Sequence, residues 1–209
     1  MKERILVTGG TGYIGSHTVV ELQNSGYDVV IVDNLSNSSA DVVDNIEKVS
    51  GIRPAFEKLD CLDLEGMDKL FTKYPGIKGI IHFAASKAVG ESVQKPLLYY
   101  RNNLVSLINL LELMPKHGVE GIIFSSSCTV YGQPDVLPVT EEAPIKKAES
   151  PYGNTKQINE EIIRDTVASG SPINAIMLRY FNPIGAHPTA LIGELPNGCL
   201  LYTSDAADE

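Results

Sequence analysis

The stretch Ile5–Ser16, ILVTGGTGYIGS, joins an apolar strand pattern to a glycine-rich turn and the start of a helix pattern. The apolar residues 5–7 predict a buried parallel strand, and apolar side chains recur at helical spacing after the turn. Gly9, Gly12 and Gly15 permit a tight turn and a close backbone approach to a phosphate, and the helix N-terminus offers N–H groups to an anion. An ordinary strand-to-helix turn is the alternative, but a strand before the glycines and a helix after them favour a dinucleotide pyrophosphate site.

Strand and helix patterns alternate along the rest of the chain, which indicates an α/β protein with a Rossmann-type, doubly wound parallel sheet. In such sheets ligands bind at the carboxyl ends of the strands. We expect strands over 5–7, 27–33, 55–59, 77–83, 119–124 and 173–178, and helices over 16–22, 41–49, 64–74, 95–117 and 151–168. His82, inside an apolar strand, is interpreted as a packed core histidine.

Asp33 ends the second predicted strand, 18 residues after Gly15. A Rossmann unit places an acidic residue at about this distance, where it binds the ribose hydroxyls of the cofactor. A carboxylate would repel a 2′-phosphate, and no arginine follows in residues 34–38, so the pattern favours NAD over NADP.

Tyr152 and Lys156 are four residues apart on a predicted helix and therefore share one face. A nearby ammonium, together with a positive nicotinamide ring, is expected to lower the pKa of the phenol and make it a usable base. Ser127, in the serine cluster after the fifth strand, can hydrogen-bond to the same substrate oxygen. The three side chains predict proton transfer at a sugar hydroxyl beside a nicotinamide.

Composition and charge favour an ordinary globular protein. The net charge of −9 argues against a general nucleic-acid binder. Nothing in the sequence predicts a signal peptide or a membrane span, and Cys61, Cys128 and Cys199 predict neither a disulfide framework nor, with the four histidines, a metal site. We therefore expect a cytoplasmic protein.

Several segments resemble the extended short-chain dehydrogenase/reductase family, most of all its members that epimerise UDP-hexoses: TGGTGYIGSH, DNLSNS, HFAASKAVGESVQKPL, SSSCTVYG, SPYGNTK and LRYFNPIGAHP. The resemblance implies that Tyr152 is the catalytic base, that Lys156 holds the nicotinamide ribose and tunes the tyrosine, and that Ser127 assists. It places these residues at the cofactor: Gly9, Gly12, Tyr13, Ile14, Gly15, Asp33, Asn34, Asp60, Cys61, Phe83, Ala84, Lys87, Asn102, Lys156 and Tyr180. It places these at the substrate: Ser127, Thr129, Tyr152, Phe181 and Asn182.

The implied activity is NAD-dependent 4-epimerisation of a UDP-hexose, such as UDP-glucose or UDP-galactose, through a transient 4-keto sugar. The implied organisation is an NAD-binding domain over 1–180 and the beginning of a truncated substrate domain over 181–198. Because the family uses later residues to hold the UDP, we expect this chain to be weakly active or inactive by itself. The resemblance also implies a homodimer of the full-length protein through the two long helices.

Two other functions stay open at this point. Sugar-nucleotide 4,6-dehydratases share the fold and the Tyr-Lys pair, but they use an Asp-Glu pair beside a threonine where this chain has Cys128-Thr129-Val130. A non-catalytic NAD-binding fragment is the other. The last residues, 199–209 (CLLYTSDAADE), depart from the family pattern and are interpreted as a non-native tail, resembling a translated sequencing adapter, that packs poorly against the core.

Overall fold

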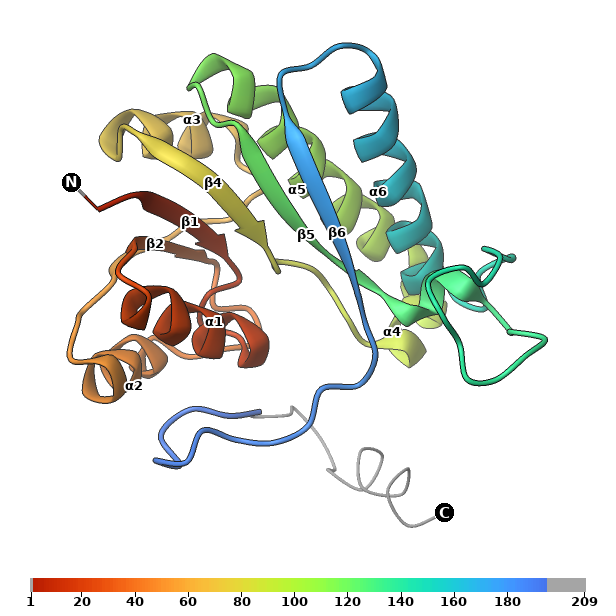
Figure 1. Ribbon diagram of the computed structural model, residues 1–209, viewed down its shortest axis with the longest axis horizontal. Coiled ribbons are helices and arrows are strands. Elements are labelled where there is room, and N and C mark those ends of the chain that lie inside the picture. Colours follow the sequence, from red (N-terminus) through yellow and green to blue (C-terminus); the bar gives the residue numbers. More distant parts are fainter. Residues whose placement is uncertain (1, 195–209) are drawn as a thin grey trace.

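The structure, a computed structural model, describes residues 2–194, and within them six strands form one parallel sheet in the order β3-β2-β1-β4-β5-β6 (Figure 1). This order reverses direction between β1 and β4, as in a Rossmann fold, so the predicted fold class is confirmed. The strands are Arg4–Thr8 (β1), Asp28–Asp33 (β2), Ala55–Lys58 (β3), Ile77–His82 (β4), Gly121–Ser127 (β5) and Asn174–Tyr180 (β6).

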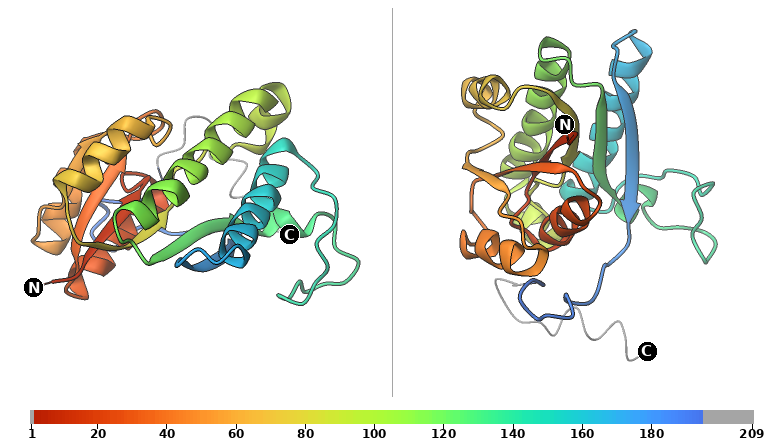
Figure 2. Two further views of the ribbon diagram at one scale, coloured as in Figure 1. Left: turned by 90° about the horizontal axis from the view of Figure 1, so that it is seen from above. Right: turned by 60° about the vertical axis from the view of Figure 1, so that its left-hand side comes forward.

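Helices lie on both faces of the sheet (Figures 1 and 2). One face carries α1 and α2, whose valines and Ile46 pack on Val7 and Ile31. The other carries α3, α5 and α6, which close a larger core around Leu6, Ile80 and Ile122. The helices are Tyr13–Asn24 (α1), Asp41–Ser50 (α2), Leu64–Lys73 (α3), Val89–Gln94 (α4), Pro96–Lys116 (α5) and Pro151–Ala168 (α6), with a 3-10 helix, η1, at Cys128–Tyr131.

Three features differ from the sequence-based expectations. The strand β5 continues through Ser127 instead of ending at Phe124, because the serines keep extended pairing with β6 as far as Ser127 and Tyr180. The short helix α4 and η1 were not predicted, since neither is long enough to show a helical period. His82, in contrast, lies buried as expected, within 2.7 Å of the Thr8 hydroxyl.

The glycines of the loop between β1 and α1 are required by close packing. Gly9 has a φ of 70°, and a Cβ there would lie 2.8 Å from the backbone nitrogen of Ala84. A Cβ on Gly15 would lie 2.1 Å from the carbonyl oxygen of Gly9. A Cβ on Gly12 would meet only that same carbonyl, at 3.2 Å. Gly9 and Gly15 therefore hold the turn closed, while Gly12 leaves its outer side open.

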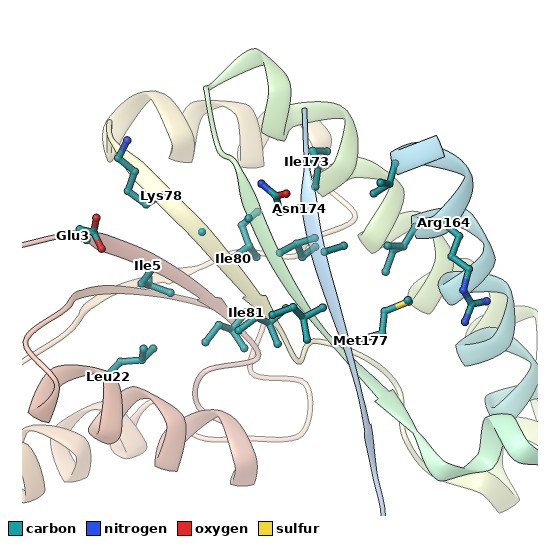
Figure 3. A pocket seen from close by; sticks show the side chains of 18 of the residues that line it. Glu3, Ile5, Leu22, Lys78, Ile80, Ile81, Arg164, Ile173, Asn174 and Met177 are labelled. Carbon is teal, nitrogen blue, oxygen red and sulfur yellow. The ribbon is translucent and has the colours of Figure 1, made fainter. Parts of the chain in front are cut away.

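The sheet is covered unevenly. On the face that carries α1 and α2, the strands β4, β5 and β6 lie partly bare (Figure 3), around an open depression of about 800 Å³. Its lining includes Ile5, Leu22, Ile123 and Ile176, and Ile176 is 58% exposed. Parallel sheets are normally covered on both faces, so this apolar surface is unusual for the fold class. None of the predicted site residues lines it.

The predicted tail, 199–209, and the end of the predicted second segment, 195–198, lie outside the described residues. The described part of that segment, 181–194, leaves β6 and runs beside the carboxyl ends of the strands (Figure 1).

We predict that Gly15→Ala destabilises the fold by about 1–3 kcal/mol, because the new methyl group must displace backbone atoms of the loop. Thermal unfolding followed by circular dichroism checks this. Gly90→Ala is the matched control, since a Cβ there has no atom within 4 Å. Equal melting temperatures for the two variants would contradict the packing account.

Candidate active site

The predicted site residues come from elements far apart in the sequence, and the structure places them at the carboxyl ends of the parallel strands. The glycine loop follows β1, and Asp33 and Asn34 lie at the end of β2. Asp60 follows β3, and Phe83 follows β4. Ser127 ends β5, and Tyr180 ends β6. This is the edge, beside the β1/β4 switch point, where doubly wound sheets bind ligands.

The N-terminus of α1 is shaped for an anion. Gly12 is the N-cap of this helix and supplies no side chain to bond the first N–H groups, which belong to Tyr13, Ile14 and Gly15. Such groups have no partner within the helix, and they carry the positive end of its dipole. The open side of Gly12 leaves room for a phosphate beside them, so this cradle fits the pyrophosphate of a dinucleotide.

Asp33 connects β2 to the glycine loop. One oxygen of its carboxylate accepts from the Thr11 N–H at 3.2 Å, and the other accepts from the Leu35 N–H at 2.9 Å and the Ser38 hydroxyl at 3.2 Å. These bonds fix the carboxylate, which is 7% exposed, beside the phosphate cradle. The sequence indicated the position of Asp33 but gave no sign of this support.

The other three residues predicted at the adenosine side, Asn34, Asp60 and Cys61, do not share one environment. The Asn34 amide donates to Asp60 at 3.0 Å, so these two side chains lie together at the sheet edge. Cys61 instead lies in the large core, and burial, followed by the nearby carboxylates, raises the pKa of its thiol to about 12. Its side chain is therefore a packing group.

The loop after β4 is fixed by a residue that the sequence analysis did not identify. The side chain of Asn103 accepts from the Ser86 N–H at 2.8 Å and donates to the Ser86 carbonyl at 3.0 Å and the Thr155 hydroxyl at 3.1 Å. The neighbouring Asn102, predicted at the cofactor, donates to the Ser86 hydroxyl at 2.9 Å. A polar residue within the apolar stripe of a helix was the available signal for Asn103.

Two further predicted cofactor residues contact the segment that follows β6. The Tyr13 hydroxyl donates to the Gly185 carbonyl at 2.5 Å, and the Lys87 ammonium pairs with Glu194 at 3.1 Å. Ala84, whose backbone nitrogen lies against Gly9, keeps the β4 loop close to the phosphate cradle.

Tyr152, Lys156 and Ser127 lie together, as the spacing predicted. The Lys156 ammonium is buried, donates to the Ser125 carbonyl at 2.7 Å, and lies 5.7 Å from the centroid of the Tyr152 ring. The Ser127 hydroxyl bonds to the Tyr152 phenol and accepts from the Thr129 N–H at 3.2 Å. Helix α6 and the end of β5 thus bring a phenol, an ammonium and a hydroxyl together.

The expected lowering of the Tyr152 pKa includes the effect of the positive nicotinamide ring, so it stays a prediction for the protein with NAD bound. Burial raises the pKa of this phenol, and the hydrogen bond with Ser127 offsets only part of the rise. Burial also lowers the pKa of the Lys156 ammonium to about 8. The low dielectric around the pair disfavours both charged forms, and this effect exceeds the attraction that the spacing suggested.

The remaining predicted site residues differ in burial. Thr129, on η1, has a buried hydroxyl with no hydrogen-bond partner among the described residues. Tyr180 is partly buried beside the ring of Phe83, with 6.5 Å between the ring centroids. Phe181 is 58% exposed, and Asn182 is exposed as well.

Residues 2–194 contain neither a metal-binding cluster nor a membrane-spanning helix. No group of three or more histidine, cysteine or acidic side chains comes together as a metal site. No helix in this part of the chain is long and apolar enough to cross a membrane.

The fold and this edge define a dinucleotide-binding α/β protein that carries a Tyr-Lys pair beside the cofactor cradle. Residues 5–199 match the model of the NAD dependent epimerase/dehydratase family. The chain belongs to this family, which confirms the family resemblance predicted from the motifs.

Individual relatives agree with this assignment. The chain is 53% identical over 194 residues to a UDP-glucose 4-epimerase of Bacillus subtilis and 48% identical over 217 residues to that of Homo sapiens, covering 93% and 99% of this chain. Among solved structures, the UDP-glucose 4-epimerase of Bifidobacterium longum in complex with NAD+ and UDP superposes with a TM-score of 0.90 at 48% identity, over 93% of this chain and 58% of that one. The Stenotrophomonas maltophila enzyme, with bound NAD and formylated UDP-arabinopyranose, gives the same TM-score and identity over 94% and 58%.

The chain spans about 60% of the length of the curated relatives that it matches, 57% for the Bacillus subtilis protein and 62% for the human one.

Proposed function

We propose that this protein is an NAD-dependent 4-epimerase of a UDP-hexose, such as UDP-glucose or UDP-galactose, and that residues 2–194 carry its cofactor site and its catalytic side chains. The observation that supports this most is the grouping of Tyr152, Lys156 and Ser127 at the same sheet edge as the phosphate cradle. The relatives named above are UDP-glucose 4-epimerases, and two of them were crystallised with NAD.

The residues at the sheet edge suit NAD. The N–H groups at the start of α1 would hold the pyrophosphate, Asp33 would bind the adenosine ribose, and Lys156 would bind the nicotinamide ribose. When bound, NAD supplies an acceptor for the hydride that leaves C4 of the sugar and gives it back.

The protein side chains handle the proton at the C4 hydroxyl. We propose that the Tyr152 phenolate takes this proton when the hydroxyl becomes a ketone and returns it when the ketone is reduced from the other face. Because burial raises the pKa of the phenol, a positive charge beside it is needed for this role, and the buried Lys156 ammonium is placed to supply one. The Ser127 hydroxyl would hydrogen-bond to the same sugar oxygen.

The substrate side of the site is less complete. We propose that 1–180 is the NAD-binding domain and that 181–198 begins the region that holds the sugar nucleotide, with Phe181 and Asn182 at the sugar. We expect the remaining groups that bind UDP to lie in the part of the relatives that this chain does not match.

A dehydratase is less well supported. Elimination of water from the sugar needs an additional acid and base beside the tyrosine. The segment η1, where these would stand, contains only Cys128, Thr129, Val130 and Tyr131. A non-catalytic NAD-binding role remains as an outcome of the activity test below.

We also propose a cytoplasmic location, because Cys61 and Cys128 are free thiols in the structure and thiols persist in reducing compartments. Recovery of the tagged protein in a non-cytoplasmic cell fraction would contradict this.

The activity test follows the conversion of UDP-galactose to UDP-glucose by the chain with NAD bound. Because the chain matches only part of its relatives, we expect a low rate, and the ratio between variants is the informative quantity. Tyr152→Phe should lower the rate by about 10²-fold or more, since it removes the proton-transferring group. Tyr27→Phe, far from the site, should leave it unchanged. Equal rates for Tyr152→Phe and the wild type would contradict the proposal, and no conversion by the NAD-loaded wild type would assign the chain by itself the non-catalytic NAD-binding role.

The cofactor preference tests Asp33. We expect the wild type to bind NAD about tenfold or more tightly than NADP, because the fixed carboxylate would lie against a 2′-phosphate. Asp33→Asn should reduce this ratio, whereas Asp41→Asn, on the exposed start of α2, should not. Calorimetric titration of each variant with both dinucleotides measures the ratio. An unchanged ratio in Asp33→Asn would assign the preference to other residues.

We propose that the full-length protein is a homodimer through α5 and α6. The start of α5 and the adjoining α4 expose Val93, Leu97 and Leu98, at 63%, 82% and 49%. Light scattering should show that Leu97→Glu shifts the protein toward the monomer, while Val136→Glu, in an exposed loop, does not. Association that survives Leu97→Glu but is lost in Ile176→Glu would place the contact on the bare sheet face instead.

A further inference from the structure

One buried carboxylate, that of Glu160 on α6, joins several elements of the proposed site. Glu160 is 1% exposed. Its oxygens accept from the Ser126 hydroxyl at 2.6 Å and from two nitrogens of Arg179 at 2.9 and 2.8 Å. A third donor, Arg164 at 2.7 Å, lies nearer the surface. A buried carboxylate with this many donors is fully satisfied.

The partners of Glu160 are immediate neighbours of proposed site residues. Ser126 precedes Ser127 on β5, and Arg179 precedes Tyr180 on β6. Residues 126 and 179 are themselves paired across the sheet. The guanidinium of Arg179 also lies 4.7 Å from the centroid of the Tyr131 ring, at the end of η1. The ion pair therefore joins α6, β5, β6 and η1, the four elements that carry the proposed catalytic and substrate groups.

Glu160 is also four residues after Lys156, the spacing at which a lysine and a glutamate on one helix attract each other. In the structure they do not pair. The Lys156 ammonium donates to the Ser125 carbonyl and lies over the rings of Phe124 and Tyr152, while Glu160 is held by its arginines and Ser126. The shift in the Lys156 pKa arises from burial alone, which agrees with a carboxylate whose charge is already neutralised.

We propose that Arg179 is a positioning residue that withholds the Glu160 carboxylate from Lys156, so that the Lys156 ammonium stays beside Tyr152. This inference rests on the proposed function, because it gives Lys156 its orientation for that reaction. Without Arg179, the buried Glu160 would lack its bidentate partner, and the ammonium four residues away would be the nearest buried cation to replace it.

Two other titratable groups near Lys156, His82 and Glu91, do not act as a counter-charge for its ammonium. His82, on β4, has a pKa lowered to about 3 by burial and then by the Lys156 charge, so it is neutral near pH 7. Glu91, on α4, is bonded to Lys95 and to the Tyr99 hydroxyl. Several titratable groups bear on the charge of Lys156, from its own helix and from the elements packed around it. They are Tyr152, Glu160, His82, Cys128, Tyr131, Arg179, Tyr180, Tyr99 and Glu91.

The test is a pH titration of Lys156 by NMR in the full chain labelled with ¹³Cε-lysine, with the resonance assigned by Lys156→Arg. In Arg179→Gln the carboxylate keeps only Ser126 and the half-exposed Arg164, and its less neutralised charge should raise the pKa of Lys156 by about one unit or more. In Glu160→Gln the unneutralised guanidinium should lower it. The double variant E160Q/R179Q carries neither charge and should return to within a few tenths of a unit of the wild type. Arg164→Gln is the matched control and should have little effect, because Arg164 is 46% exposed.

The directions in which the Lys156 pKa shifts in the variants decide the outcome. Shifts in the same direction in Arg179→Gln and Glu160→Gln, or no shift in either, would overturn the inference. If Arg179→Gln does not fold, the downward shift in Glu160→Gln and its reversal in the double variant make the same test. The titration uses no sugar nucleotide, so the activity test of the proposed function can fail without affecting this result. In an active protein, the conversion rate should fall in Arg179→Gln and recover partly in the double variant.

Discussion

Backbone touches backbone where the glycine loop passes the end of β4, and this contact sets the geometry of the whole site. Gly9 lies against Ala84, and Gly15 lies against the Gly9 carbonyl, so neither position accommodates a side chain. The contact fixes where α1 begins, and with it the direction of the N–H groups of Tyr13, Ile14 and Gly15. It also holds the β4 loop beside those groups. The shape of the phosphate cradle is therefore set by backbone contacts between the loops that follow β1 and β4, and less by any side chain.

The second half of the site depends on buried charge. Lys156 is a buried ammonium bonded to a backbone carbonyl, and Glu160 is a buried carboxylate one helical turn away. Burial of an unpaired charge is costly, and direct pairing of these two would be the simplest way to reduce the cost. Arg179 neutralises the carboxylate instead, which leaves the ammonium beside Tyr152. The strand β6 thereby contributes to the site through Arg179, which was not among the predicted site residues.

Much of the fold was predictable because its signals are local. Apolar runs and glycines located the strands and the loop, and the spacing of Tyr152 and Lys156 located the reactive helix face. The predictions failed where the outcome depends on tertiary surroundings. Periodicity says nothing about Asn103 fixing the Ser86 loop, or about Glu160 meeting Arg179 across two elements. The spacing of Tyr152 and Lys156 shows the neighbouring ammonium but not how deeply the phenol is buried, and this burial raises the pKa of Tyr152 in the chain by itself. The resemblance places Cys61 at the cofactor, which stays a prediction, and no local pattern shows that its thiol packs in the core.

The central claim is that one sheet edge holds both a dinucleotide and the groups that move a proton. A crystal structure of the chain with NAD tests it most directly. The account predicts the pyrophosphate at the N–H groups of Tyr13, Ile14 and Gly15 and the adenosine ribose at Asp33. It predicts the nicotinamide ribose within hydrogen-bond distance of the Lys156 ammonium and beside the Tyr152 phenol. A dinucleotide bound elsewhere, or bound with its nicotinamide end away from Tyr152, would contradict it.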